Sequence, residues 1–594
     1  MRSTYHHTGS PDAALANAVK TRPSSRVLAG GILVVGVVVV AIVFATLNGG
    51  TPSATPGNPP IAGGPTAAQS AGATPGSTST TLGQPGVTQG PTTSFAPSFA
   101  PSSSLGSAGG TPSPAPSQAP GKPGAVPIVP VADYRSTASS VSPADVRAVV
   151  AGTSTQWQSL ELVADQAGAV LATLGVTRGD AGARLVLAPD AASLMDDLAS
   201  HRDRLAFMRD DQVGPGVTAL AWKQSSLFGV HRVKSLAAWS LDATLPVTLP
   251  GVAPFATATT WTMFAAGDIG LDRTVYYQAV LLHQGADFPY DGGTAQITGL
   301  TCCSQFGWKV PVIASTGHPG AMRDLISSAD LALANMEESA PNNYSFHSSG
   351  TVLTGDPALL SGVAHSGIDV VSCASTHIGD GGPNAIAQTL RNLAKYGIDS
   401  FGAGPNLAAA GRPAIYEEGG IKVAILGFDG ISSKYYGATA TSTGDNPLKP
   451  AYVRADIAAA RAAGADVVIA FPHWGIEYTR GPSAKQQKLG HMMIDAGADL
   501  VIGNHPHWAQ AMEVYKGRPI WYALGNFTYD QSWSEPTLEG ITLELTFRSG
   551  TLVQARMNPH ILIKAVQPNL LDPAGDGQRV LGPIYKASGQ LLPW

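Results

Sequence analysis

The sequence predicts an α/β fold, because three segments of the chain repeat one pattern of helix, tight turn and apolar strand. The strand portions read "IDVVSCAS", "ADVVIAF" and "ADLVIGN". Each follows a helical pattern and a turn in which glycine precedes an aspartate by two residues, and each leads into a histidine. Such alternation is the repeating unit of a parallel or mixed sheet covered by helices.

Histidines follow the strands of all three segments. They are His377, His473, and the pair His505 and His507 in "GNHPHW". The ligand crevice of an open α/β sheet lies outside the carboxyl ends of its strands. We therefore expect the four imidazoles to converge on one rim of one sheet.

Carboxylates are predicted at the same edge. The strand "WTMFAAGD" ends at Asp268, and "LALANMEE" ends around Asn335 and Glu337. Imidazole and carboxylate ligands suit zinc, manganese or iron, and this set is large enough for two adjacent divalent ions. Two such ions can polarise a phosphoryl or carbonyl oxygen and activate water. The alternative for Asp268 and Glu337 is a structural role as a helix cap or turn residue.

Composition narrows the class of protein. The 594 residues are 44% hydrophobic and 13% charged, which allows a sizeable core. A net charge of −5 without a basic stripe gives no reason to expect a nucleic-acid partner. The three cysteines form no C-x-x-C motif. A bridge between the adjacent Cys302 and Cys303 is one alternative, but buried free thiols are expected.

The N-terminal region predicts a membrane anchor. Residues 27–47 are apolar and uncharged, and are long enough to cross a bilayer as a helix. Lys20, Arg22 and Arg26 precede this segment, and no basic residue follows until Lys122. Residues 1–26 are therefore expected in the cytoplasm and the remainder outside it, in a single-pass protein of the cell membrane. A cleaved signal peptide is the alternative.

Four further regions follow the anchor. Residues 48–126 are rich in Pro, Gly, Ser and Thr and predict a disordered linker. Residues 127–248 alternate strand and helix patterns and predict a small α/β domain. Its "VPIVPV" and "SPADVRAVVAGTSTQWQ" resemble part of a periplasmic solute-binding domain of the phosphate-binding kind. Residues 258–565 contain the predicted site, and residues 566–594 form a C-terminal extension.

Residues of about 260–565 resemble the CapA family of poly-γ-glutamate capsule synthesis proteins, which is related to the calcineurin-like metallophosphoesterases. The resemblance rests on motifs that occur in the family's order: "GD" ending at Asp268, N-x-E, "ASTHIGDGG", "FGAG", "HWGIEY", "GNHPH" and "YALGNFTYD". It implies a calcineurin-like α/β sandwich and a role in capsule or cell-envelope polymer synthesis or anchoring. Capsule-synthesis proteins would be partners.

The resemblance also implies roles for individual residues. His377 would act on the substrate as a general acid or charge stabiliser, with Asp380 orienting its imidazole. Glu337 would bridge two metal ions. The matching metal positions are Asp268, Glu337, Thr376, His473, His505 and His507, and the supporting or substrate-binding positions are Asn335, Glu477 and Asn526.

Two departures from the family pattern leave two functions open. Thr376 stands where the family has asparagine, and a hydroxyl is a weaker metal ligand than an amide carbonyl. Asp268 is followed by Ile269 and Gly270, without the D-x-H of many metallophosphoesterases. One hypothesis is a metal-dependent hydrolase acting on a phosphoester or a γ-linked amide polymer outside the membrane. The other is a non-catalytic surface module that binds an anionic polymer through the same rim.

Overall fold

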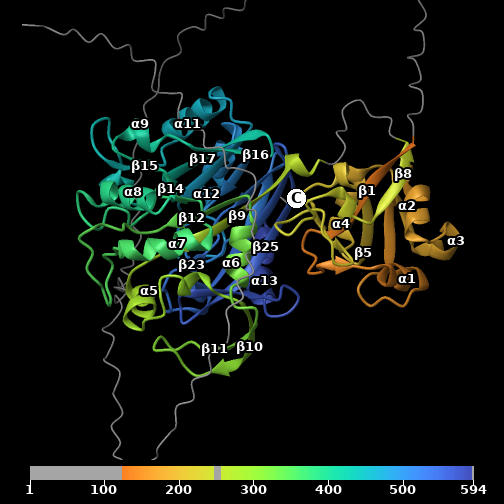
Figure 1. Ribbon diagram of the computed structural model, residues 1–594, viewed down its shortest axis with the longest axis horizontal. Coiled ribbons are helices and arrows are strands. Elements are labelled where there is room, and N and C mark those ends of the chain that lie inside the picture. The colour runs from red at the N-terminus through yellow and green to blue at the C-terminus, as the bar shows by residue number, and fades with distance from the viewer. Residues whose placement is uncertain (1–122, 247–255, 592–594) are drawn as a thin grey trace, which may run out of the picture. The chain divides into compact units, whose positions relative to one another are not determined.

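The computed structural model of the chain describes residues 123–246 and 256–591 (Figure 1). The expected cytoplasmic tail, membrane helix and nearly all of the linker, residues 1–122, lie outside the described residues. Within the two described ranges, none of the helices combines the length and the apolar composition that crossing a bilayer requires.

Residues 123–246 form a six-stranded mixed sheet flanked by helices. Its order is β4-β3-β5-β1-β6, with β8 paired to β1. The α1 helix begins as its sequence predicts, because Ser142 caps it and Pro143 takes the first position, and it ends at Gly152 with φ 73°. The elements are β1 Pro123–Asp133, α1 Pro143–Ala151, β3 Ser159–Val163, α2 Ala167–Leu174, α3 Arg178–Ala181, β4 Leu185–Ala188, α4 Ala191–Ser200, β5 Arg204–Arg209, β6 Val217–Ala219 and β8 Asp242–Pro246.

The larger region contains a ten-stranded sheet in the order β11-β10-β26-β25-β24-β9-β12-β13-β14, with β23 also paired to β9. Strands β9, β12, β13 and β14 run parallel. The strands are β9 Thr260–Ile269, β10 Thr294–Thr301, β11 Val310–Gly317, β12 Leu331–Met336, β13 Val370–Ser372, β14 Asp399–Phe401, β23 Asn526–Thr528, β24 Glu539–Arg548, β25 Thr551–Ile563 and β26 Gln567–Leu571.

A second sheet of six strands has the order β16-β17-β19-β20-β22-β21, and β17, β19, β20 and β22 are parallel. The strands are β16 Ala414–Glu418, β17 Ile421–Asp429, β19 Val467–His473, β20 Leu500–Ile502, β21 Met512–Tyr515 and β22 Arg518–Trp521. Two small pairs complete the described strands: β2 Ser140–Val141 with β7 Ala221–Trp222, and β15 Ala403–Gly404 with β18 Gly444–Asp445.

The two large sheets pack face to face between two layers of helices. Alternate residues of each strand point to opposite faces, so Leu333 of β12 joins Ile469 of β19 in the core between the sheets, whereas Ala332 faces the outer helices. Helices α6 Ala321–Ser328, α7 Leu360–Ser366 and α8 Ala385–Lys395 cover the ten-stranded sheet, and α11 Pro450–Ala462 and α12 Ala484–Asp495 cover the six-stranded sheet. The predicted α/β fold is confirmed.

The three repeated segments do not share one sheet, so the expectation of a single rim is wrong. Strand β13 belongs to the ten-stranded sheet, whereas β19 and β20 belong to the six-stranded sheet. A helix–turn–strand pattern specifies a buried strand but not its neighbours. The antiparallel pair β16–β17 begins a new sheet between the first segment and the other two.

The cysteine expectation is also wrong. Cys302 and Cys303 form a disulfide in the exposed connection between β10 and β11, and only Cys373 is a buried free thiol. This hairpin extends away from the body of the sheet (Figure 1).

The C-terminal residues continue the larger fold. Strand β26 lies between β25 and β10, and Val580, Leu581 and Ile584 of α13 (Gln578–Ser588) are buried in the core between the sheets. Three short helices lie in connections: α5 Arg273–Tyr276, α9 Leu407–Ala410 and α10 Ser433–Tyr436.

Candidate metal centre

Two neighbouring parallel strands hold the predicted carboxylates. Asn335 of β12 pairs in register with Asp268 of β9, and the Glu337 backbone amide donates to the Ile269 carbonyl. Parallel pairing thus brings both carboxylates to the same edge of the ten-stranded sheet. Both side chains are fully buried.

The histidines come from the edge of the facing sheet. His473 is the last residue of β19, and His505 and His507 lie in the loop after β20. Both loop histidines have a left-handed backbone, with φ of 94° and 59°, which is uncommon outside glycine. Gly503 begins the loop, and a Cβ there would overlap the Tyr522 carbonyl oxygen. This close approach explains the need for glycine.

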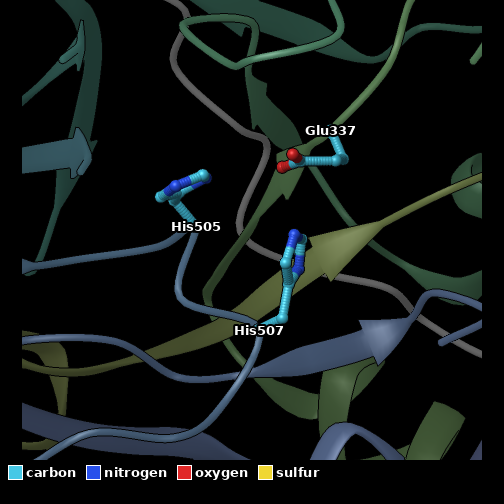
Figure 2. Close-up of side chains that lie close together, drawn as sticks. All are labelled: Glu337, His505 and His507. Carbon is cyan, nitrogen blue, oxygen red and sulfur yellow. The ribbon is translucent and has the colours of Figure 1, made fainter. Parts of the chain in front are cut away.

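Two groups of potential metal ligands result, and Glu337 belongs to both. One group is Glu337, His505 and His507, and the other is Asp268, Glu337 and His473; in each, the ligand atoms lie within 4.8 Å of one another. Figure 2 shows both loop imidazoles and the Glu337 carboxylate directed toward a shared space. This arrangement can hold divalent ions.

Unpaired polar atoms in the centre also fit a cation. Asn335 Oδ1 and Asn504 Oδ1 are buried acceptors without a hydrogen bond from any described residue, and Asp268 Oδ2 and Glu337 Oε1 face only imidazole nitrogens, at 3.1 Å from His507 Nδ1 and 3.5 Å from His473 Nε2. Unpaired buried acceptors are costly unless a partner is supplied. Oxygen and imidazole donors together match the ligands of zinc, manganese and iron.

The pKa shifts of the candidate ligands are also consistent with a metal site. Burial, together with the neighbouring His505, His507 and His377, lowers the pKa of His473 well below its usual value, and burial likewise lowers the pKa of His505. Neutral imidazole is the form that binds metal. Burial and the Asp268 charge raise the pKa of Glu337. A bound cation would offset the effects of burial and of the Asp268 charge on Glu337, and would favour the ionised form of its carboxylate.

Asn335 and Ser375 brace the carboxylates. Asn335 Nδ2 donates to Asp268 Oδ1 at 2.9 Å and to Glu337 Oε2 at 2.8 Å, and the Ser375 hydroxyl donates to Glu337 Oε2 at 2.9 Å. The two shortest contacts of Asn335 Nδ2 are therefore to the carboxylates, and His473 Nδ1 lies farther away at 3.3 Å. Ser375 was not identified from sequence; its place two residues before His377 was the available signal.

Thr376 faces the histidines of the other sheet. Its hydroxyl lies 2.8 Å from His473 Nε2 and 3.4 Å from His505 Nδ1. The residue expected to be a weak ligand therefore lies among the ligand atoms. Its hydroxyl is thus within hydrogen-bonding distance of two candidate ligand imidazoles.

His377 and Asp380 form a pair beside the ligands. His377 Nδ1 lies 2.7 Å from Asp380 Oδ2, and His377 remains about one-fifth exposed. Asp380 also accepts a hydrogen bond from the Tyr436 hydroxyl at 3.1 Å and from the Leu353 amide at 3.0 Å. Tyr436 was not predicted from sequence, because it lies 56 residues from Asp380 without a recognisable motif.

Asn526 lies beside the loop, whereas Glu477 does not join the cluster. Asn526 Oδ1 is 3.0 Å from His507 Nδ1, and the Asn526 carbonyl is 2.9 Å from His560 Nε2. Glu477 is exposed, and its nearest described interaction is with the adjacent Tyr478. The sequence alone could not show that Asn526 lies at the site and Glu477 does not, because both residues belong to motifs near histidines.

An aromatic wall flanks His507 and was also missed from sequence. The His507 ring stacks on Tyr529 with a centroid separation of 5.1 Å, and Tyr478 packs against His507 and against Trp533. The Arg273 guanidinium lies over Tyr529 and is paired with Asp530 at 2.6 Å. These rings hold the His507 imidazole in one orientation.

Comparison with known proteins accounts for this geometry. A model of the bacterial capsule synthesis protein PGA_cap matches residues 262–531, which include every ligand candidate. Residues 262–531 therefore match the bacterial capsule synthesis protein family, and we call them the CapA domain. The family resemblance seen in the sequence, the CapA proteins, is confirmed.

The CapA domain has relatives in several organisms. The PGA biosynthesis protein CapA of Bacillus subtilis is 38% identical over 28% of this chain and 43% of its own length. The capsule biosynthesis protein CapA of Bacillus anthracis is 31% identical over 42% of this chain and 62% of its own. The chain thus spans less than two thirds of either relative. A probable polyglutamine synthesis accessory protein of Mycobacterium tuberculosis is 28% identical over 48% of this chain and 77% of its own.

Among solved structures, the NAD nucleotidase of Haemophilus influenzae matches over 56% of this chain and 60% of its own, with 12% identity and a TM-score of 0.31. This similarity is too low to support an inference about the CapA domain.

Proposed function

We propose that the CapA domain is a two-metal hydrolase of calcineurin-like design that acts on a capsule or cell-envelope polymer of the poly-γ-glutamate type. The observation that carries the proposal is the pair of buried ligand groups that share Glu337. In a two-metal site, one carboxylate commonly belongs to the ligand sets of both ions, and imidazoles and further carboxylates complete each set. Glu337 has this shared position. The names of the relatives supply the class of polymer.

The residues divide between two ions. Glu337, His505 and His507 would hold one, and Asp268, Glu337 and His473 the other, with Asn504 and Thr376 as further donors at the same edge. When bound, such ions polarise a phosphoryl or carbonyl oxygen and lower the pKa of water. Asn335 and Ser375 fix the carboxylate oxygens that do not face the ions.

His377 would move the proton of the reaction. Asp380 holds its Nδ1, which leaves Nε2 to donate a proton to a leaving group. The Tyr436 hydroxyl donates to Asp380, so the orientation of the His377 imidazole depends on both Asp380 and Tyr436. A carboxylate held in this way also stabilises the protonated ring after it has accepted a proton.

A second candidate function is binding without hydrolysis, and Thr376 is the observation that favours it. Its hydroxyl bonds to His473 where an amide would offer a stronger ligand. A domain with one weakly held ion would still bind the carboxylates of an anionic polymer. Under both functions we place the domain outside the cytoplasm, attached to the membrane by residues 27–47 and working with capsule-synthesis proteins.

The test is hydrolysis by the metal-loaded full chain. Poly-γ-glutamate and bis-p-nitrophenyl phosphate should be assayed in parallel, for the chain length of the polymer and for released nitrophenol. Hydrolysis of either that is lost in His507→Ala but kept in His365→Ala supports the enzyme. His365 is the control because it is an exposed histidine on α7 whose ion-pair partner, Asp287, is not a candidate metal ligand. Binding of the polymer without cleavage of either compound would instead support the binding module.

A further inference from the structure

A pocket with a volume of about 170 Å³ is lined in part by residues that follow the metal ligand His473 in the chain, and it plays no part in the function proposed above. By volume it corresponds to roughly six molecules of liquid water. Five apolar side chains and two glycines form most of its wall. The lining residues are Gly430, Ile431, Leu448, Trp474, Gly475, Ile476, Ser483, Lys485, Gln486 and Leu489.

The chain connects this pocket directly to the metal ligands. Trp474 and Gly475 follow His473 at the end of β19, and Gly430 follows the last residue of β17. The Gly430 amide donates to the His473 carbonyl at 2.8 Å. The pocket wall is therefore continuous in sequence with the predicted metal ligand His473.

Two glycines keep the pocket open. A Cβ on Gly475 would overlap the Gln486 side chain, and its φ of 110° disfavours any other residue. A Cβ on Gly430 would come within 2.8 Å of Leu448 Cδ2. Side chains at these two positions would narrow the space, so the cavity depends on specific residues and is not a gap between loops.

One cation in the wall is free to bind a ligand. Ser483 and Gln486 bond to one another, and Gln486 Nε2 donates to Gln510, so these polar groups are already engaged. Lys485 is exposed and forms no hydrogen bond or ion pair with any residue in the described ranges. Its ammonium group is the remaining charge at the mouth of an apolar pocket.

These features specify the chemistry of the occupant. Apolar walls favour an aliphatic body, because burying methylene groups is favourable. The unpaired ammonium favours one negative charge at the end of that body. An inorganic phosphate would pair with the ammonium but make no apolar contact with the wall. A neutral aliphatic chain would contact the wall but leave the ammonium unpaired.

We propose that this pocket binds a short aliphatic carboxylate, as the side chain or end group of an acidic polymer whose neighbouring unit lies at the metal centre. That the pocket serves the metal centre rests on the proposed function, whereas carboxylate binding does not. The pocket would then select substrates with a carboxylate at a fixed spacing from the bond at the metals.

The probe is butyrate, which has an aliphatic body and one carboxylate, titrated calorimetrically into the full chain with EDTA present. EDTA removes the metals, so the result does not depend on whether the domain is a hydrolase. Butyrate should bind, and Lys485→Met should weaken its binding about fivefold, as expected for one exposed charge pair. Ile431→Phe, which fills the pocket, should weaken binding more than tenfold. Lys488→Met, an exposed lysine one turn further along α12, should bind as the unsubstituted chain does.

Several results would overturn the proposal. Binding that is seen only without EDTA would place the carboxylate on the metals. Equal affinity in Lys485→Met and Lys488→Met, or displacement of butyrate by equimolar phosphate, would show that the pocket does not recognise an aliphatic carboxylate. Circular dichroism melting of Ile431→Phe ensures that lost binding is not lost folding; if this variant unfolds, Leu448→Phe fills the same pocket and takes its place.

Discussion

The Thr376 hydroxyl lies 2.8 Å from His473 Nε2 and thereby joins the ends of two strands that belong to different sheets. Thr376 follows β13 of the ten-stranded sheet, and His473 ends β19 of the six-stranded sheet. The candidate metal centre is thus built where the edges of two packed sheets meet. Its geometry depends on how the sheets pack as well as on each strand.

Thr376→Asn should raise the metal content of the chain. An amide carbonyl is a better ligand than a hydroxyl, and the side chain already lies among the imidazoles. Elemental analysis after dialysis against limiting manganese or zinc should show more metal per chain than in the unsubstituted protein. Thr376→Val is the control, and equal or lower metal in Thr376→Asn than in Thr376→Val would show that position 376 does not face an ion.

His377→Gln should abolish hydrolysis while leaving the metal bound. General acid–base catalysis contributes about a hundredfold or more, and His377 contacts Asp380 and not the shared carboxylate. Tyr436→Phe should cause a smaller loss and shift the pH profile, since it removes one hydrogen bond to Asp380. Rates and metal content are measured on the same samples. Loss of metal in His377→Gln would make this residue a ligand.

Stability should depend on pH through His560. Burial lowers the pKa of His560 from its ordinary value of 6.5 to about 4. Between these values the unfolded chain binds a proton that the folded chain does not, so stability falls as the pH falls from 6.5 toward 4. The His560→Gln variant lacks this pH-dependent contribution to stability. From pH 7 to pH 4.5 the unsubstituted chain should lose about 2 kcal/mol more than the variant, at roughly 1.4 kcal/mol per pKa unit.

Urea unfolding in EDTA at the two pH values, followed by tryptophan fluorescence, provides the measurement for His560. Because each protein is compared with itself at the two pH values, a difference between the two proteins in stability at pH 7 does not affect the result. An identical loss of stability in both proteins would mean that His560 is protonated in the folded state.

Gly503→Ala should destabilise the fold and disrupt the loop that carries His505 and His507. The added Cβ would overlap the Tyr522 carbonyl oxygen and lies close to the Trp474 indole nitrogen. Overpacking of this kind costs about 1–3 kcal/mol. Gly481→Ala is the matched control, because a Cβ at Gly481 meets no atom within 4 Å. Equal thermal midpoints for the two variants would contradict the close approach at Gly503.

Much of the site could be predicted because its residues stand at strand ends. The patterns before Asp268, Glu337 and His473 specify buried strands. A residue at the carboxyl end of a parallel strand lies at the edge of the sheet, whichever strands are its neighbours. The structure brings those residues together with His505 and His507. The ends of α1 at Ser142 and Gly152 are equally local, because a capping side chain and a glycine in the left-handed region define them.

Features that depend on distant contacts could not be predicted. The pairing of β16 with β17 has a local signal in the Gly419–Gly420 turn, but no local pattern specifies that β17 then pairs with β19 in a second sheet. Tyr436 reaches Asp380 across 56 residues, and Glu477 turns to solvent although its neighbour Tyr478 packs against His507. Side-chain direction after a strand end is set by packing, which a single sequence does not reveal.

The most direct test of the central claim is the metal content of the Glu337→Gln variant of the full chain. Glu337 belongs to both ligand groups, so its loss should lower the occupancy of both ions. Elemental analysis after equilibration with manganese or zinc should find about two ions per unsubstituted chain, the same in His365→Ala, and fewer than one in Glu337→Gln. Equal metal in Glu337→Gln and the unsubstituted chain would contradict a shared two-metal centre.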